Sequence, residues 1–340
     1  MRAALRARAG AAFLAALAFP GALSGAEPLP TIAATRVAGP LPGGPRDPGW
    51  GKLASVEVTL YPQAAVAPAA RARPLALALR AAHDGRTLAL QLAWRDATRS
   101  RTRGIGAFAD ALAVQWALGG ESELPYVGMG HRGHPVALWF WRADGTVETL
   151  AAEGFGTLSA QRADGVQAEG AWHDGHWQVV LRRALDSAAS PLHARLAPDA
   201  AVPVAVAIWD GGAQERDGTK RLSGWHALAL DPAHAARAAA SRVAGNAANG
   251  KRLMTVKGCV ACHAFPGNPA RPTLGPDLSF AGGIHAPGYL REALSAPDKI
   301  ILPGKGYATA EGGTRRSIMP PLEASAAERE DLVAFLLTLK

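Results

Sequence analysis

The sequence predicts a mixed two-domain protein, with an N-terminal β-sandwich of immunoglobulin-like type followed by a small all-α domain. Two observations carry this prediction. Short alternating apolar runs broken by Gly, Asp and Pro fill the first two thirds of the chain, where all nine tryptophans lie between Trp50 and Trp225. Helical periodicity and both cysteines appear only after an alanine-rich segment near residue 235. A length of 340 residues and a hydrophobic content of 49% suffice for two folded cores.

The first 26 residues are expected to be a secretory signal peptide. Arg2, Arg6 and Arg8 precede a short apolar run, and the small residues of LSGA place the cleavage site after Ala26. A membrane anchor is the alternative, but the apolar run is about half of the ~20 residues that a transmembrane helix needs. No later segment is long and apolar enough to span a bilayer. We therefore expect a mature protein that is exported to the periplasm and has no membrane span.

The net charge of the mature chain indicates which class of macromolecule it could bind. Removal of the three signal-peptide arginines lowers the formal net charge from +8 to +5, and no dense Lys/Arg block remains. Nucleic acid is therefore not an expected partner. A moderately basic surface is better suited to an acidic patch on another protein.

Residues 27–232 are predicted to form the sandwich. The run PLALALRAAHDGRTLALQLAW alternates apolar residues on both sides of Asp84–Gly85, a dipeptide typical of hairpin turns. The same pattern recurs around Asp144–Gly145 and Asp174–Gly175. Several short strands with such turns favour an antiparallel sandwich.

Residues 233–245 are predicted to be a linker that carries at most a short helix, and residues 246–340 to be helical. In the last helix, Ser325 and Glu328 form a capping-box pattern. A shorter helix is expected in PGYLREALSAPDKI, where Pro297 ends it, and a third in NAANGKRLMTVKG. The last helix has one apolar face: Leu332, Phe335, Leu336 and Leu339.

Cys259, Cys262 and His263 form the C-x-x-C-H pattern of c-type haem attachment. Two thiols at this spacing can each add to one vinyl group of a haem, and the next residue can then reach the iron as the proximal ligand. A redox disulfide or half of a zinc site would use the same cysteines. The chain has no second cysteine pair for zinc, and no thioredoxin-like pattern surrounds this one. We therefore predict one covalent haem c.

The C-terminal ~95 residues resemble the class I cytochrome c domain. TLGPDLS matches the loop in which a proline carbonyl, here that of Pro276, braces the proximal histidine. SIMPP matches the loop that supplies a distal methionine, so the resemblance implies Met319 as the sixth ligand. Met254 is the competitor, but it lies on the helix that leads into the cysteines and is better explained as a core residue.

Met129 is not explained by the cytochrome domain. The chain has only four methionines, and this one lies between two glycines in LPYVGMGHRGHPVALWFW. It could fill a gap in the core, but flanking glycines also let backbone approach a bulky flat partner. Lys220 is a second unusual residue, because residues 27–245 contain twenty arginines and only two lysines. A neutral amine can ligate a metal whereas a guanidinium cannot, although a solvated loop lysine would also explain it.

Three stretches resemble the haem-binding γ subunits of ethylbenzene dehydrogenase and related periplasmic molybdenum enzymes, such as dimethylsulfide dehydrogenase and selenate and chlorate reductases. The stretches are FADALAVQW, LPYVGMGHRGHPVALWFW and AIWDGGAQERDGTKRLSGWHAL, and the resemblance covers roughly residues 45–230. In that family a methionine and a lysine hold a non-covalent haem b within the sandwich. Carried over, the ligands are Met129 and Lys220. Several of those subunits end after this domain, whereas this chain continues into the cytochrome domain.

Other residues compete for roles at this second site. His131 and His134 are the rival iron ligands. Two residues three apart in one turn cannot reach opposite faces of a haem, but one of them could take the place of Lys220. Trp139, Phe140 and Trp141 could line the haem or face inward to the core. His173 and His176 flank a hairpin turn and are expected to face solvent.

The sequence thus predicts a periplasmic electron-transfer subunit with one haem b and one haem c, and not a catalyst itself. The resemblance implies an iron–sulfur subunit and a molybdopterin catalytic subunit as partners, and a soluble cytochrome as donor or acceptor. Three alternatives stay open: a free-standing dihaem or monohaem shuttle or sensor, an enzyme that uses the b haem as an open five-coordinate site, and a sandwich that binds carbohydrate and holds no haem b.

Overall fold

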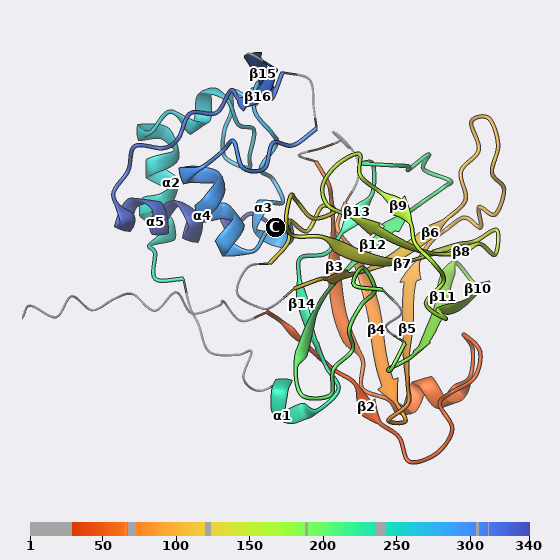
Figure 1. The fold of residues 1–340 in the computed structure, drawn as a ribbon. Helices are drawn as coiled ribbons and strands as arrows, with labels where there is room; N and C mark the ends of the chain where they lie inside the picture. The colour runs from red at the N-terminus through yellow and green to blue at the C-terminus, as the bar shows by residue number, and fades with distance from the viewer. Residues whose placement is uncertain are drawn as a thin grey trace, which may run out of the picture.

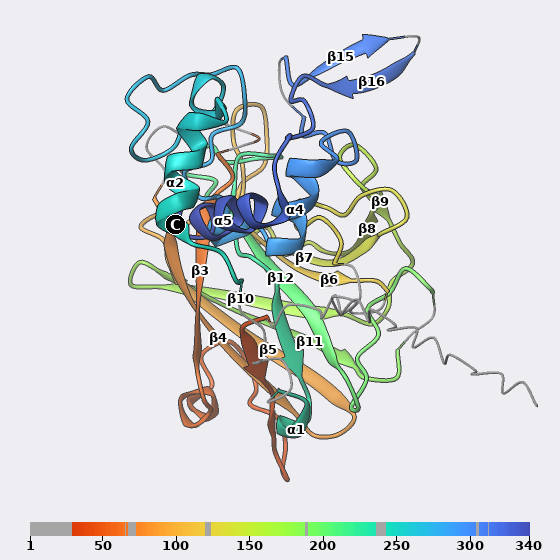
Figure 2. The same cartoon turned by 90° about the vertical axis from the view of Figure 1, so that its left-hand side faces the viewer.

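The computed structural model describes residues 29–64, 66, 73–119, 124–187, 190–235, 243–303, 306–311 and 313–340. The expected signal peptide, 1–26, lies outside these residues, as does most of the expected linker. In the described part of the chain, none of the helices combines the length and the apolar character needed to cross a membrane. Figures 1 and 2 show a two-layered β-structure and, against one end of it, a group of helices.

The strands of the N-terminal region run as follows: β1 (Thr31–Ala33), β2 (Thr35–Arg36), β3 (Val56–Pro62), β4 (Leu75–His83), β5 (Thr87–Arg95), β6 (Ala111–Ala117), β7 (Val136–Arg142), β8 (Val147–Ala152), β9 (Ser159–Ala160), β10 (Gln167–His173), β11 (His176–Ala184), β12 (Ala201–Trp209), β13 (Arg221–Leu222) and β14 (His226–Ala229).

Two sheet layers form the predicted sandwich. One layer has the order β10-β11-β5-β4-β3, and the other runs β12-β6-β7-β8-β9, with β13 joining β3 to β12. Most neighbours are antiparallel; β1–β14 and β2–β4 are parallel. All three predicted turns connect hairpins. In the third, Asp174 (φ 48°) and Gly175 (φ 73°) both lie in the left-handed region that a two-residue hairpin turn requires.

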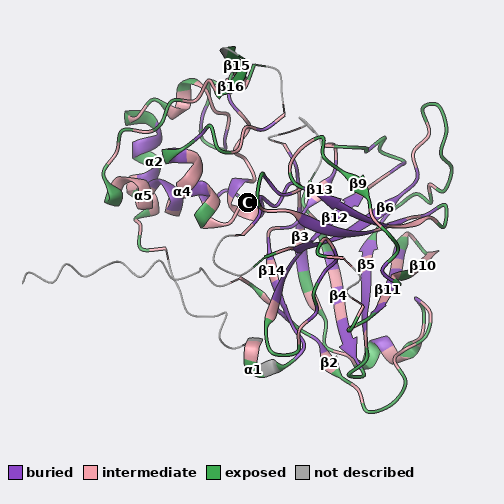
Figure 3. Cartoon of the chain, in the orientation of Figure 1, coloured by how far each residue is buried: buried purple, intermediate pink, exposed green. Residues whose placement is uncertain are grey.

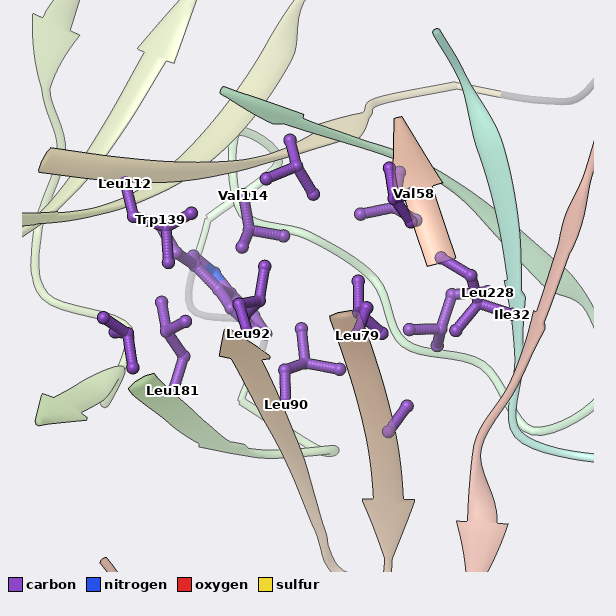
Figure 4. Packing of buried hydrophobic residues seen from close by; sticks show 14 of the residues in the cluster. Ile32, Val58, Leu79, Leu90, Leu92, Leu112, Val114, Trp139, Leu181 and Leu228 are labelled. Carbon is purple, nitrogen blue, oxygen red and sulfur yellow. The ribbon is translucent and has the colours of Figure 1, made fainter. Parts of the chain in front are cut away.

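The main core fills the space between the two layers. Leu90 and Leu92 of β5 point toward Leu112 and Val114 of β6, and all four are fully buried (Figure 4). Burial of each such side chain contributes about 1.5–3 kcal/mol, so alternating positions hold the layers together. Figure 3 shows this buried interior continuing along most strands.

The helical region follows the sandwich in the chain. It contains α2 (Ala247–Val256), η3 (Cys259–Ala261), α3 (Ala281–Ile284), α4 (Pro287–Ser295) and α5 (Ala326–Leu336); two shorter elements, η1 (Pro48–Lys52) and α1 (Pro232–Ala235), precede it.

Close packing of α2 on α5 organises this region. A Cβ on Gly250 would lie 1.9 Å from the carbonyl oxygen of Asp331, so only glycine permits the crossing. The predicted capping box is present: Ser325 Oγ accepts from the Glu328 backbone N–H, and the Glu328 carboxylate accepts from the Ser325 N–H. The shorter helix ends at Ser295, two residues before Pro297.

A β-hairpin that the sequence reasoning did not predict interrupts the helical region. Strands β15 (Ala308–Glu311) and β16 (Thr314–Ser317) pair antiparallel and project from the helices (Figures 1 and 2). The expected all-α domain is therefore helical around its core and carries one hairpin, which ends two residues before Met319.

Candidate haem centres

The Cys259–His263 motif follows directly from the end of α2. Gly258 ends that helix in the left-handed conformation (φ 77°), and the chain then turns through η3. The His263 N–H donates to the Cys259 carbonyl at 3.0 Å, which closes the turn. Both cysteines are free thiols and half-buried. The turn thus presents two unpaired thiols and an imidazole from five consecutive residues.

His263 is held by its predicted partner. Its Nδ1 lies 2.8 Å from the carbonyl oxygen of Pro276. Burial lowers the pKa of His263, so the ring is neutral at neutral pH and Nδ1 must carry the proton that it donates. The lone pair is then on Nε2, as an iron ligand needs. A Cβ on Gly275 would lie 2.8 Å from His263 Cε1, so glycine there lets the loop approach the ring.

Met319 and Cys259 pack against the same apolar cluster, formed by α2, α4 and α5. Met319 is half-buried, and its N–H donates to Ser317 Oγ at 3.1 Å. Met254 is 2% exposed and belongs to the interior of that cluster, as its interpretation as a core residue predicted. The Cys259–His263 turn supplies two thiols and a neutral imidazole, and Met319 supplies a thioether beside the cluster that Cys259 also contacts. This donor set fits a covalent haem.

Met129 lies in a tight turn and has a strained backbone. Its φ of 91° is unusual for a non-glycine residue. The turn is closed by the Gly130 N–H, which donates to the Tyr126 carbonyl at 2.7 Å. A Cβ on Gly130 would lie 2.7 Å from the carbonyl oxygen of His134. The turn itself therefore requires this glycine, which is a different reason from the approach of a flat partner that the sequence suggested.

Lys220 is a buried lysine without a charged partner. It is 8% exposed, and no described residue gives its Nζ a hydrogen bond or an ion pair. Nζ lies 5.0 Å from the centroid of the Trp209 ring. Burial lowers the pKa of Lys220 to about 8, against a weaker opposing effect of Asp217. An amine that loses its proton this readily can bind a metal.

A second apolar cluster brings the Met129 turn and the Lys220 loop together. It covers the face of β6 and β12 that points away from the main core, where Ala113, Ala205 and Ala207 are buried. Met129 and Trp209 both pack against this cluster, and Lys220 lies over Trp209. Small side chains beneath a thioether and a buried amine fit a flat, non-covalent haem.

The aromatic run on β7 is divided between the two clusters. Trp139 and Trp141 are in the main core, whereas Phe140 is on the opposite face. There its ring centroid lies 5.5 Å from that of Trp209. The two tryptophans therefore face the core, which was one of the two interpretations of this run. Phe140 faces the second cluster, so lining of a haem stays a prediction for this residue alone.

The histidines near Met129 have other interactions. His131 and His134 stack with ring centroids 4.4 Å apart. The Tyr126 N–H donates to His131 Nδ1 at 3.1 Å, so Nδ1 is an acceptor and a neutral His131 carries its proton on Nε2. This tautomer leaves Nε2 without a lone pair for iron. His173 and His176 are exposed, as expected for a hairpin turn.

A cavity of about 1480 Å³ lies between the sandwich and the helical region. Tyr126, His131, His285 and Tyr289 are among its lining residues, but Met129 and Lys220 are not. The cavity therefore borders the Met129 turn without marking a position for the iron.

Sequence reasoning missed a carboxylate cluster. Asp96, Asp110 and Asp210 bring carboxylate oxygens within 4.8 Å of one another. Asp110 is fully buried and accepts hydrogen bonds from the Ser100 N–H, the Gly211 N–H and Trp177 Nε1. Each aspartate lies next to a strand end, but only the fold brings the three ends together. The role of Asp110 is to tie two loops to the core.

Comparison with known proteins agrees with this geometry. The family model described as ethylbenzene dehydrogenase matches residues 47–165 and 159–221, more than half of the chain. The chain belongs to this family. A cytochrome c family model matches residues 247–340, so this family member carries a fused cytochrome c domain. The predicted resemblance and the predicted two-part fold are both confirmed.

Three relatives have haem- or gamma-subunit names. A candidate respiratory nitrate reductase heme subunit, ORF7, of Haloferax mediterranei is 34% identical over 55% of this chain and 68% of its own length. The chlorate reductase subunit gamma of Ideonella dechloratans is 34% identical over 62% of this chain and 87% of its own. The dimethylsulfide dehydrogenase subunit gamma of Rhodovulum sulfidophilum is 30% identical over 43% and 57%.

Among solved structures, a family 9 carbohydrate-binding module of Caldicellulosiruptor kristjanssonii overlaps 59% of this chain and 95% of its own length, with a TM-score of 0.34 and 10% identity. An overlap this loose carries no argument about ligands. The family and its cytochrome c domain indicate an electron-transfer role with haem as the cofactor.

Proposed function

We propose that this family member is a periplasmic subunit that relays single electrons through one non-covalent haem b and one covalent haem c. The observation that carries the proposal is the presence of two separate donor sets in one chain. One is Met129 with the buried Lys220, to which no described residue gives a hydrogen bond or an ion pair; the other is the Cys259–His263 turn with Met319. When bound, a haem iron cycles between ferrous and ferric states and so carries one electron.

The residues supply what such a relay requires. Lys220 lies where burial favours the neutral amine. The Pro276 carbonyl fixes the tautomer of His263. With two protein ligands for each iron, neither site keeps a position for substrate, so we propose a non-catalytic role. The partners proposed are an iron–sulfur subunit with a molybdopterin catalytic subunit on one side and a soluble cytochrome on the other.

Haem typing tests this proposal. The mature protein is extracted with acidified acetone, and pyridine haemochrome spectra are taken of the extract and the pellet. One extractable haem b and one pellet-bound haem c per chain are expected. A haem signal in the pellet alone would mean that the protein is a monohaem cytochrome c and that Met129 is only a packing residue. Tight carbon monoxide binding by the reduced native protein would contradict two protein ligands at each iron.

A further inference from the structure

Three aromatic side chains meet where the sandwich contacts the helical region. Tyr126 begins the turn that holds Met129. His285 caps the C-terminal end of α3, and Tyr289 lies in the first turn of α4. The Tyr126 ring centroid is 5.6 Å from that of His285 and 4.9 Å from that of Tyr289. His285 and Tyr289 are themselves 4.5 Å apart. Each ring thus contacts both of the others, and the Tyr126 ring makes its two contacts across the interface.

Both ends of this trio reach a candidate haem site. On the sandwich side, the Tyr126 carbonyl accepts from Gly130 and its N–H donates to His131, so its backbone is part of the turn that holds Met129. On the helical side, Tyr289 packs against the same apolar cluster as Met319. The trio is therefore a continuous chain of contacts from the Met129 turn to the Met319 cluster.

Beside the cavity, two further contacts bring the two regions close together. A Cβ on Gly283 would lie 2.5 Å from the Tyr61 ring, so glycine permits α3 to approach β3. Ile284 is 5% exposed and belongs to the same cluster as Met129 and Trp209. The helical region thus covers part of the second apolar cluster directly.

The three side chains of the trio are themselves uncharged at physiological pH. Burial lowers the pKa of His285 to about 4, so its ring is neutral at physiological pH. Burial likewise raises the pKa of the Tyr126 and Tyr289 phenols, which stay protonated. No proton needs to move when an electron passes such rings, and no charge has to be desolvated.

We propose that Tyr126, His285 and Tyr289, here called the aromatic bridge, position the two haem domains and provide the route for electron tunnelling between them. The inference rests on the proposed function. With both haems bound, an electron lost by a ferrous iron at one site would be gained by a ferric iron at the other. The rings are neither oxidised nor reduced. Their ring contacts place protein atoms across the interface beside the cavity. A route through atoms in contact is favoured because tunnelling rates fall steeply with distance and across voids.

The test uses the full dihaem protein. Absorbance of haem b and haem c is followed after flash photoreduction in wild type, Tyr289→Leu and Tyr289→Phe. We expect Tyr289→Leu to slow equilibration between the haems by at least an order of magnitude, and Tyr289→Phe to restore it, since the ring and not the hydroxyl makes the contact. The matched control is Phe155→Leu. The Phe155 ring centroid lies 5.8 Å from that of Tyr126, but Phe155 belongs to the sandwich and does not cross the interface. The rate of equilibration between the haems should therefore stay at the wild-type value.

A second measurement does not depend on haem b. Amide hydrogen exchange of residues 124–130 reports on docking from the opposite side of the interface. Exchange should rise in Tyr289→Leu and not in Tyr289→Phe. An unchanged interhaem rate in Tyr289→Leu, with both haem spectra and both potentials intact, would overturn the tunnelling route. If wild type holds no haem b, the proposed function fails, and unchanged exchange would then overturn the positioning role as well.

Discussion

His263 Nδ1 donates a hydrogen bond to the Pro276 carbonyl at 2.8 Å, and Gly275, between this proline and the histidine ring, has no room for a side chain. The proline loop and the C-x-x-C-H turn therefore form one unit, although thirteen residues separate the bonded pair. The hydrogen bond fixes which nitrogen can bind iron, and such outer contacts raise the basicity of a ligating imidazole.

Gly275→Ala should damage the haem c site while leaving the sandwich intact. The added Cβ would lie 2.8 Å from His263 Cε1 and 3.1 Å from the Cys262 carbonyl, so the loop or the ring must move. We expect reduced covalent haem per chain and a lower haem c potential, measured by pyridine haemochrome and redox titration. The control is Gly288→Ala, where a Cβ meets nothing within 4 Å. Normal haem c in Gly275→Ala would mean that the loop tolerates the methyl group.

Lys220→Ala should remove or convert haem b without changing the haem c spectrum. Lys220→Arg is the sharper variant, because a guanidinium keeps the positive charge but does not deprotonate to bind iron. Both variants should therefore lose the native b spectrum. If only the positive charge of Lys220 mattered, Lys220→Arg would keep that spectrum. The readout is the reduced-minus-oxidised spectrum of the purified protein. An unchanged b spectrum in either variant would refute Lys220 as the ligand.

Acid should release haem b before haem c. In the haem-free fold the pKa of Lys220 is about 8, below its ordinary value of 10.5. The folded chain therefore holds fewer protons than the unfolded chain between these values, and stability of the haem-free sandwich rises with pH across this window. Below it protons compete with iron for the amine lone pair. A pH titration of the b spectrum should show weakening binding as pH falls, while haem c is unaffected. Binding that is independent of pH would contradict amine ligation.

Asp96→Asn should stabilise the sandwich at neutral pH. Burial raises the pKa of Asp96 to about 6, and the nearby Asp110 and Asp210 carboxylates act in the same direction. The folded chain thus binds more protons than the unfolded chain between about 4 and 6, so stability falls as pH rises through this window and stays lower above it. The amide removes the buried charge and keeps an oxygen for the Thr98 N–H. We expect a gain of about 1–2 kcal/mol at pH 7 and little gain at pH 4, measured by urea unfolding.

If Asp96→Asn and wild type were equally stable at pH 7 as well as at pH 4, another group would have to compensate the buried charge of Asp96. Asp47→Asn is the matched control, because Asp47 accepts backbone hydrogen bonds that lower its pKa. That variant should not gain stability at neutral pH.

The sequence alone was sufficient for the local features of this protein. Hairpin turns at Asp84, Asp144 and Asp174, the capping box at Ser325 and the C-x-x-C-H turn were all predicted, because each depends on residues a few positions apart. Alternation of period two gave the sandwich, since one face of each strand must be buried. The hairpin before Met319 was missed because its exposed strands carry no apolar alternation.

Contacts between residues that are far apart in the sequence became known only from the tertiary structure. It buries Lys220 over the Trp209 ring, whereas composition could only mark this loop lysine as unusual. It separates Phe140 from the two tryptophans beside it, because strand parity and sheet stacking assign opposite faces. It also joins Tyr126 to Tyr289, 163 positions later, by docking one domain on the other. Such contacts arise from packing between elements, which no local pattern encodes.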